Sequence, residues 1–466
     1  MKSNISSRLF FTLLTLVLVI TVSACGPSTI QQLASAVPPT EAVEQEAEVE
    51  QTVEETTEVE VADTPVPTEV PPTPMPEAED ILLVAQGFGQ DEREVGVAFV
   101  VENPNTSYAI NSSQYQIAVY DASDVVVETS SGYIELLLPG EKLGIGDSIY
   151  VDEGVTVAKV VIQLNAGEAE PAETTTTFTV DKIAYYPGDW FDQVIGVITN
   201  PYQKTITDLR VSAVLYNAAG EIIGSGFTYT NFILAESSAG VEFTVAGAGE
   251  VDRVEIYPAL SGLSTLDFGN EKPVGAQDLV LVDYGYGQGD YEVGFGMILQ
   301  NPNSGYAVEN SMYHITLYAE DGGVIGEEGG YIDTLLPNQT LGVGNSLYLV
   351  QDGFTVANVE VQILSGNYEA SEEIPTFTTE NVTYIDNEYF PSVTGEVVSP
   401  YATDISNLRV SAIVYDEAGK IIGGGFTFLD FVPANGKAAV EVNITCVGTP
   451  ARVELYATLS ALSDIE

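Results

Sequence analysis

The chain has 466 residues, with 68 acidic residues against 14 Lys and Arg, one His and two Cys, and its formal net charge is −54. This charge argues against a nucleic-acid partner, because phosphate contacts require clustered Lys and Arg. A single His leaves no basis for a His-rich metal site, and the length suggests about three domains, or more if they are small sandwiches. Asp and Glu can act without His, so composition does not exclude an enzyme.

The first 24 residues have the pattern of a secretory signal peptide. Lys2 and Arg8 precede an apolar stretch, Phe10–Val22, and small residues follow it. A basic start, a short apolar region and small residues before a cut are typical of secretion signals. Thirteen residues of helix cover only ~20 Å, which is too short to span a ~30 Å hydrocarbon core comfortably.

The end of this signal, Val-Ser-Ala-Cys at 22–25, resembles the bacterial lipobox. The resemblance implies that Cys25 is acylated, becomes the first residue of the mature protein and anchors it to a membrane. Everything after Cys25 would then lie outside the cytoplasmic membrane, at the cell surface. The alternative is a plain signal peptide with an incidental Cys. Whether the anchor is in an inner or an outer membrane stays open.

Residues 25–80 differ in composition from the rest of the chain. Between Glu41 and Asp80 there are 14 acidic and no basic residues, and eight prolines lie between Pro38 and Pro76. Such a segment buries too little apolar surface to offset the entropy lost on ordering. Proline and like charges favour extended conformations. The sequence therefore predicts a disordered acidic tether.

The remaining residues form two long repeats. Asn-Pro-Asn at 103–105 recurs at 301–303, an offset of 198, and Leu-Arg-Val-Ser-Ala at 209–213 recurs at 408–412, an offset of 199. A weaker period of 97 relates Asn103-Pro104 to Asn200-Pro201. Units of this length match an immunoglobulin-like sandwich of about 100 residues. The predicted domains are a signal peptide (1–24), a lipid-anchored tether (25–80) and four sandwiches (81–170, 171–275, 276–368 and 369–466).

Alternating apolar residues predict β-strands throughout this region. In the stretch 209–216, Leu209 and Val211 alternate with Arg210 and Ser212. Period two indicates a half-buried strand, with the Leu and Val side in the core and the Arg side in solvent. Short turn-helices are expected only near 106–113 and 304–311, where the alternation lapses. The predicted fold is all-β, with tandem immunoglobulin-like β-sandwiches, although one larger two-sheet body per long repeat is an open alternative.

A strand ending in Tyr, followed by a turn, recurs in all four units. Ala-Val-Leu-Tyr-Asn at 213–217 and Ala-Ile-Val-Tyr-Asp at 412–416 are two examples. With the preceding Asn-Pro turn, this pattern resembles the FxLYD domain of bacterial lipoproteins, and it is also similar to the water-stress (WHy) sandwich. The resemblance implies a small extracytoplasmic sandwich. It implies no catalytic residue.

One aromatic cluster is a candidate ligand site. Tyr186 and Trp190 lie close together in the first repeat, and Tyr389 and Phe390 occupy the matching stretch of the second. Exposed rings beside polar groups suit sugar binding, because flat apolar faces stack on sugar rings while polar groups bond to hydroxyls. The alternative is that these rings fill the cores or seal neighbouring sandwiches.

One acidic cluster is a candidate metal site. Asp283, Asp290 and Glu292 flank the glycine-rich run at 285–289. Carboxylates that converge on a loop suit Ca²⁺, although the dedicated calcium-loop spacing is absent, so any Ca²⁺ site here would be weak. The alternative is an ordinary linker or hairpin. His314 is expected at a surface or a strand edge, because no second His or Cys is present to make it a ligand.

Together these features predict a cell-envelope lipoprotein. It is expected to bind, adhere or scaffold without catalysis, with a membrane contacted through its lipid and a surface protein or glycan as a further partner. A glycan-binding module is one alternative, and an extracytoplasmic hydrolase is another. The tether holds 14 of the 68 acids and the signal peptide two of the 14 bases, so residues 81–466 keep 54 acids against 12 bases, or −42. The charge thus covers the predicted sandwiches themselves.

Overall fold

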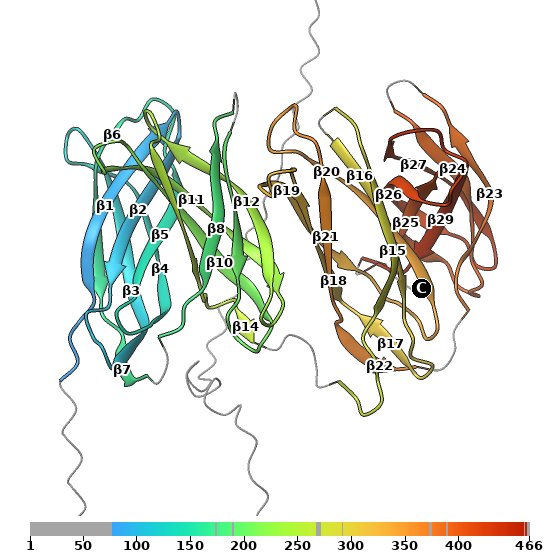
Figure 1. Cartoon of the computed structure of the whole chain (residues 1–466), viewed down its shortest axis with the longest axis horizontal. Coiled ribbons are helices and arrows are strands. Elements are labelled where there is room, and N and C mark those ends of the chain that lie inside the picture. The colour runs from blue at the N-terminus through green and yellow to red at the C-terminus, as the bar shows by residue number, and fades with distance from the viewer. Residues whose placement is uncertain are drawn as a thin grey trace, which may run out of the picture. The chain divides into compact units, whose positions relative to one another are not determined.

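A computed structural model describes residues 77–172, 175–188, 191–266, 272–290, 292–371, 375–387, 390–460 and 462–463, all within one compact unit that spans 75–466. The regular structure of these residues consists of strands β1 to β29 (Figure 1). This confirms the predicted all-β chain of tandem sandwiches. The predicted signal peptide, Cys25 and almost all of the tether lie outside the described residues. No described helix is long and apolar enough to cross a membrane.

The first sandwich has a three-stranded sheet, β1-β2-β5, facing a second sheet, β4-β3-β6, to which β7 adds. Side chains from both sheets, among them Phe99, Ile117 and Leu143, form its core. The strand bounds are β1 Leu82–Asp91, β2 Glu94–Glu102, β3 Tyr108–Asp121, β4 Val126–Leu137, β5 Lys142–Tyr150, β6 Val157–Asn165 and β7 Glu168–Pro171.

The second sandwich places β8, β9 and β12 over β10, β11 and β13. A short pairing of β11 with β12 joins the two layers into one strongly bent sheet, and β14 adds to β10. Leu209, Val211 and Val241 lie in the core between the layers. The strand bounds are β8 Thr179–Tyr186, β9 Asp192–Thr199, β10 Ile206–Tyr216, β11 Ile222–Ile233, β12 Ser238–Gly247, β13 Arg253–Ala259 and β14 Thr265–Leu266.

The third and fourth sandwiches repeat this plan. The third has sheets β15-β16-β20 and β19-β18-β21 with the pair β17-β22, and the fourth has β23-β24-β27 and β28-β26-β25-β29. Their bounds are β15 Val280–Gln288, β16 Glu292–Gln300, β17 Tyr306–Glu309, β18 Ser311–Tyr318, β19 Val324–Ile332, β20 Thr340–Tyr348, β21 Asn358–Leu364, β22 Asn367–Ala370, β23 Thr378–Ile385, β24 Ser392–Val398, β25 Ile405–Tyr415, β26 Ile421–Val432, β27 Lys437–Asn443, β28 Thr445–Cys446 and β29 Arg452–Thr458.

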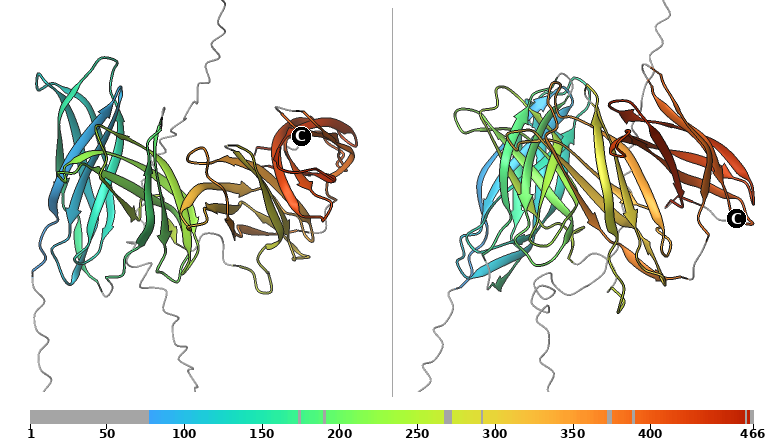
Figure 2. Two further views of the ribbon diagram at one scale, coloured as in Figure 1. Left: turned by 45° about the horizontal axis from the view of Figure 1, so that its top comes forward. Right: turned by 45° about the vertical axis from the view of Figure 1, so that its right-hand side comes forward.

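Within each repeat the two sandwiches pack sheet against sheet, and we call the result a sandwich pair (Figure 1 and Figure 2). In the first pair, Ala98 and Val100 of β2 pack on Val214 and Tyr216 of β10. The sheets approach so closely that a Cβ atom at Gly96 would lie 2.1 Å from the carbonyl oxygen of Ala246. The second pair uses the same kind of contact.

This packing corrects the prediction that the Arg side of β10 faces solvent. Both faces of β10 are largely buried, because one faces its own core and the other faces the first sandwich. The Arg210 guanidinium lies half-buried between the sandwiches, 3.9 Å from the centre of the Phe227 ring, and donates to the carbonyl of Gly146 at 2.6 Å.

The glycine-rich run at 285–289 forms the end of β15 and the start of the β15–β16 hairpin, which is one of the two ordinary structures expected for it. Side chains at Gly285 and Gly287 would strike the backbone of β26. One other local prediction was wrong. The expected turn-helices near 106–113 and 304–311 are occupied by β3 and β17. In both places, pairing and packing with distant strands set the local conformation.

The two sandwich pairs meet at an interface that we call the internal junction. Ile195 of β9 packs on Val324 of β19, and the rings of Tyr186 and Phe354 lie edge to face with centres 5.5 Å apart. The Gln362 amide donates to the carbonyl of Ser238 at 2.7 Å. The junction therefore combines apolar contacts with specific hydrogen bonds.

Candidate functional site

A cleft of about 570 Å³ opens between the third and fourth sandwiches. The β15–β16 hairpin and β20 form one wall, while β26, β28 and the residues before β24 form the other. Its lining includes polar and aromatic side chains, among them Asp290, Glu292, Asn345, Tyr348, Phe390 and Asn443. We call it the aromatic cleft.

Two aromatic rings at the aromatic cleft face solvent. Phe390 is 72% exposed and Tyr348 is 70% exposed. Such rings lose little entropy on binding and offer flat apolar faces. The arrangement therefore suits a ligand with flat apolar surfaces bordered by polar groups.

Hydrogen bonds fix the polar residues of the aromatic cleft. The Thr445 hydroxyl donates to the Glu292 carboxylate at 2.6 Å and so bridges the two sandwiches. The Asn345 amide donates to the Tyr313 hydroxyl at 3.0 Å. Cys446 is half-buried beside them, and burial raises the pKa of its thiol, which keeps it protonated near neutral pH. The cleft is a fixed polar surface, and it holds no activated nucleophile among these residues.

The first sandwich pair carries part of this arrangement at the equivalent positions, with Asp147 and Ala246 in place of Asn345 and Thr445. Tyr150 and Phe191 are exposed at offsets of 198 and 199 from Tyr348 and Phe390. Ser148 donates its hydroxyl to Glu94, the counterpart of Glu292. The pKa of Tyr150 is raised, first by burial and then by the nearby Glu94 carboxylate. Both pairs therefore present an exposed Tyr, an exposed Phe and a fixed carboxylate.

The structure gathers some of the predicted site residues and separates others. Phe390, predicted for sugar binding, shares the aromatic cleft with Asp290 and Glu292, predicted for metal binding. Tyr186 instead packs on Phe354 in the internal junction. Trp190, Tyr389 and the lipidation residue Cys25 lie outside the described residues.

The predicted calcium site is not assembled. Asp283 is exposed on β15, where its carboxylate accepts the backbone N–H of Tyr284 at 2.9 Å, and it does not line the cleft that holds Asp290 and Glu292. Among the described residues, no three His, Cys, Asp or Glu side chains are placed to hold a metal ion.

His314 is not at a surface or an edge, which corrects the prediction. It is 3% exposed on β18, the central strand of its sheet, and its ring lies against Phe232 of the second sandwich. Burial lowers the pKa of His314 to about 4, so the ring is neutral at physiological pH. Sequence reasoning missed this because the second sandwich covers the face on which His314 lies.

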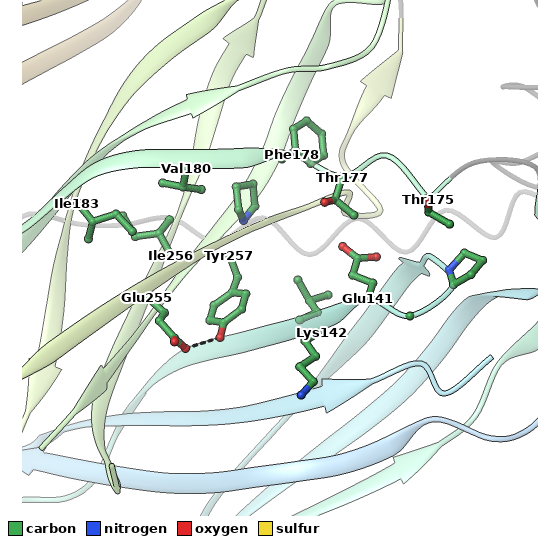
Figure 3. A pocket seen from close by; sticks show the side chains of 14 residues that line it. Glu141, Lys142, Thr175, Thr177, Phe178, Val180, Ile183, Glu255, Ile256 and Tyr257 are labelled. Carbon is green, nitrogen blue, oxygen red and sulfur yellow. Dashed lines mark hydrogen bonds between the residues drawn. The ribbon is translucent and has the colours of Figure 1, made fainter. Parts of the chain in front are cut away.

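A second hollow of about 500 Å³ lies within the first sandwich pair (Figure 3). Burial raises the pKa of Glu141 in its wall to about 7. Its carboxylate accepts the backbone N–H of Leu138 at 2.7 Å, and Gln339 does the same for Leu336 in the second pair at 2.8 Å. Figure 3 shows Glu141 apart from Glu255, which accepts the hydroxyl of Tyr257. An amide thus makes the same backbone contact in the other repeat.

Several residues of the aromatic cleft were missed by sequence reasoning. Tyr348 and Asn345 lie on β20, whereas Thr445 lies on β28 of the other sandwich, so no local motif unites all three. The sequence does contain a repeat that marks two of these residues, because Gly-Asp-Ser-Ile-Tyr at 146–150 recurs as Gly-Asn-Ser-Leu-Tyr at 344–348.

Comparisons with known proteins identify no relative. No family model and no curated protein matches the chain. It is similar to part of the alpha-2-macroglobulin of E. coli at 8% identity, over 78% of this chain and 27% of that one, with a TM-score of 0.13. It is also similar to part of dimeric latent PorU from Porphyromonas gingivalis at 10% identity, over 83% and 33%, with a TM-score of 0.12. The chain thus spans between a quarter and a third of these proteins, and TM-scores this low carry no conclusion about its function.

Proposed function

We propose that this chain is a lipid-anchored envelope protein that binds glycan chains, without catalysis, in the aromatic cleft of its second sandwich pair and at the equivalent surface of the first. The observation that carries the proposal is the exposed pair Tyr348 and Phe390 above a hydrogen-bonded polar wall. Rings of this kind stack on sugar faces, and the fixed Asn, Ser, Thr and Glu groups supply partners for hydroxyls.

The charge of the cleft narrows the ligand class. Asp290 and Glu292 line it, and the whole sandwich region carries 54 acids against 12 bases. An acidic polysaccharide would therefore be repelled. The expected ligand is a neutral or amino-bearing glycan.

Duplication supports binding to a repeating polymer. When two weak sites lie on one chain, the second contact becomes intramolecular, so attachment to a multivalent surface is far stronger than either site alone. The lipobox-like sequence ending at Cys25 and the acidic tether support display outside the cytoplasmic membrane.

The test is binding of the soluble chain from Gly26 onward to an array of neutral, amino-bearing and acidic glycans. Replacing Tyr348 and Phe390 by Ala removes both exposed rings from the aromatic cleft. We expect the avidity for an immobilised glycan polymer to fall by about 100-fold or more. Adding Tyr150→Ala and Phe191→Ala should abolish binding. Tyr331→Ala is the matched control, because Tyr331 is similarly exposed but lies outside the cleft.

The proposal fails if no glycan is bound, or if the fourfold variant binds as the original chain does. The anchor is tested separately by expressing the full chain with Cys25→Ser in a bacterium. We expect that variant to leave the detergent-soluble membrane fraction, whereas the unaltered chain stays in it. An unchanged distribution would contradict the anchor and leave the glycan result standing.

A further inference from the structure

The internal junction joins two different surfaces of the sandwich fold. One is the outer face of β8-β9-β12 with the end of β11, and the other is the outer face of β19-β18-β21. At its centre Phe232 lies against His314, with ring centres 6.2 Å apart, and Gln362 bonds to the backbone of Ser238. The contact is therefore heterologous, since the two partners contribute unlike faces.

Because the chain is duplicated, each of these surfaces occurs a second time. The sheet β4-β3-β6 of the first sandwich is the counterpart of β19-β18-β21, and we call its outer face, with Gln116, Val126 and Gln163, the head face. The sheet β23-β24-β27 and the end of β26 are the counterpart of β8-β9-β12 and β11. We call that surface, with Phe431 and Ala439, the tail face.

Apolar residues that the internal junction buries are exposed on the head and tail faces. Val324 is 0% exposed, whereas its counterpart Val126 on the head face is 48% exposed. Phe232 is 0% exposed, whereas its counterpart Phe431 on the tail face is 58% exposed. Each face therefore presents the surface of an interface with no described residue covering it.

We propose that the head face of one copy of this chain docks on the tail face of another, in the geometry of the internal junction. The end of β26 would then enter the hollow of about 460 Å³ that Gln116, Tyr133 and Gln163 line on the head face. Phe431 takes the place of Phe232, and Gln163 takes the place of Gln362 as donor to a backbone carbonyl. A heterologous contact leaves one face free at each end, so assembly is open-ended.

Side-chain sizes on the head and tail faces are complementary. At the internal junction a Cβ atom on Gly240 would lie 2.5 Å from Cγ2 of Thr316, so that position requires glycine. The tail face has the larger Ala439 there. The head face has the smaller Ala118 in place of Thr316, which leaves room for the added methyl group.

One like-charge contact of the internal junction is missing between the head and tail faces. The internal junction brings Glu242 near Glu327, and burial raises the pKa of both carboxyls. The equivalent positions of the free faces are Glu441 and Thr129, so this like-charge pair is absent. The tail face has Thr394 where the junction has Ile195, which removes apolar area. Docking between copies is therefore weaker than the internal junction and depends on concentration.

The test is sedimentation velocity of the soluble chain from Gly26 onward over a range of concentrations and salt. We expect the sedimentation coefficient to rise with concentration, and to rise more steeply at high salt, because copies that each carry a large net negative charge repel one another less when screened. Val126→Glu on the head face and Phe431→Glu on the tail face should each abolish the rise. Leu263→Glu, at an exposed residue outside both faces, should leave it unchanged.

Mixing the two single variants gives the decisive result. The Val126→Glu chain keeps its tail face and the Phe431→Glu chain keeps its head face, so the mixture should form dimers and nothing larger. Circular dichroism of each variant checks that it folds. A single sedimenting species at every concentration up to the solubility limit would overturn the proposal, as would a mixture that stays monomeric while the unaltered chain assembles. The cleft residues take no part, so glycan binding and assembly fail independently.

Discussion

Asn103 and Asn301 act as buried anchors of the first and third sandwiches. Each side-chain amide donates to three backbone carbonyls; for Asn103 these are Tyr108, Leu137 and Leu138, at 2.8 to 3.0 Å. The side-chain oxygen accepts the backbone N–H two residues later. In the fourth sandwich Ser399 holds this position, and its hydroxyl accepts only the N–H of Tyr401, at 3.2 Å.

We expect Asn301→Ala to lower the free energy of unfolding by about 3 kcal/mol, because buried carbonyls lose their donor. The reverse change, Ser399→Asn, should raise stability by about 1 kcal/mol, since a longer amide reaches the carbonyls of Val432 and Pro433, which match those bonded in the second sandwich. Urea denaturation measures both. An Asn301→Ala chain as stable as the original would show that water replaces the amide.

The sequence predicted turns at the Asn-Pro motifs, and these motifs do lie in the short connections that follow β2, β9 and β16. It did not predict that the Asn side chains point inward, because their partners lie more than thirty residues away in the chain. The residue types of the aromatic cleft were partly predicted, as Phe390, Asp290 and Glu292 show. Their convergence was not, since it depends on how two sandwiches pack.

At the scale of strands, glycine sets the spacing between sandwiches. β2 carries Gly96 where it crosses the second sandwich, and β16 carries Gly294 at the equivalent point. A strand with glycine facing outward has no side chain to hold the neighbouring sheet away, so backbones approach closely. Alternation in β10 correctly predicted which residues enter its own core. The alternation did not reveal that the other face of β10 is buried as well. Small and apolar residues on that face are compatible with exposure to solvent and with contact to a neighbouring sheet.

We expect Gly96→Ala to destabilise the first sandwich pair by about 3 kcal/mol, because the added Cβ would overlap the carbonyl of Ala246 and force the sheets apart. Gly305→Ala is the matched control, since a Cβ there meets no atom within 4 Å. Thermal unfolding followed by circular dichroism compares them. Equal melting temperatures for the two variants would show that the sheets move apart without cost.

At the scale of the whole molecule, the stability of the internal junction between the two sandwich pairs depends on pH. Burial raises the pKa of Glu242 to about 7 and that of Glu327 to about 8. Burial also raises the pKa of Glu328, with Arg409 opposing it. Burial lowers the pKa of His314 to about 4, so the ring is neutral in both states above its ordinary pKa of 6.5. Above that pH, only the carboxyls change the stability of the junction.

The docked junction holds protons that the separated state releases, so we expect its stability to fall as the pH rises from about 6.5 to about 8.5. Differential scanning calorimetry should show a falling Tm over this range, and Glu327→Gln should flatten the decline because the amide carries no proton to lose. Glu153→Gln, at an exposed residue, is the control. A Tm that rises with pH in the original chain would contradict the assignment.

The close sheet contact also explains the length of the duplication. Val214 and Tyr216 on the second sandwich and Ala98 and Val100 on the first are buried only because the two sandwiches face each other. Duplication of one sandwich alone would have left the apolar surface of this contact exposed to solvent. Copying both together yielded a self-sufficient unit, which accounts for strong identity at an offset of 198 residues and only faint similarity at 97. The unit that was duplicated in this protein is therefore the sandwich pair.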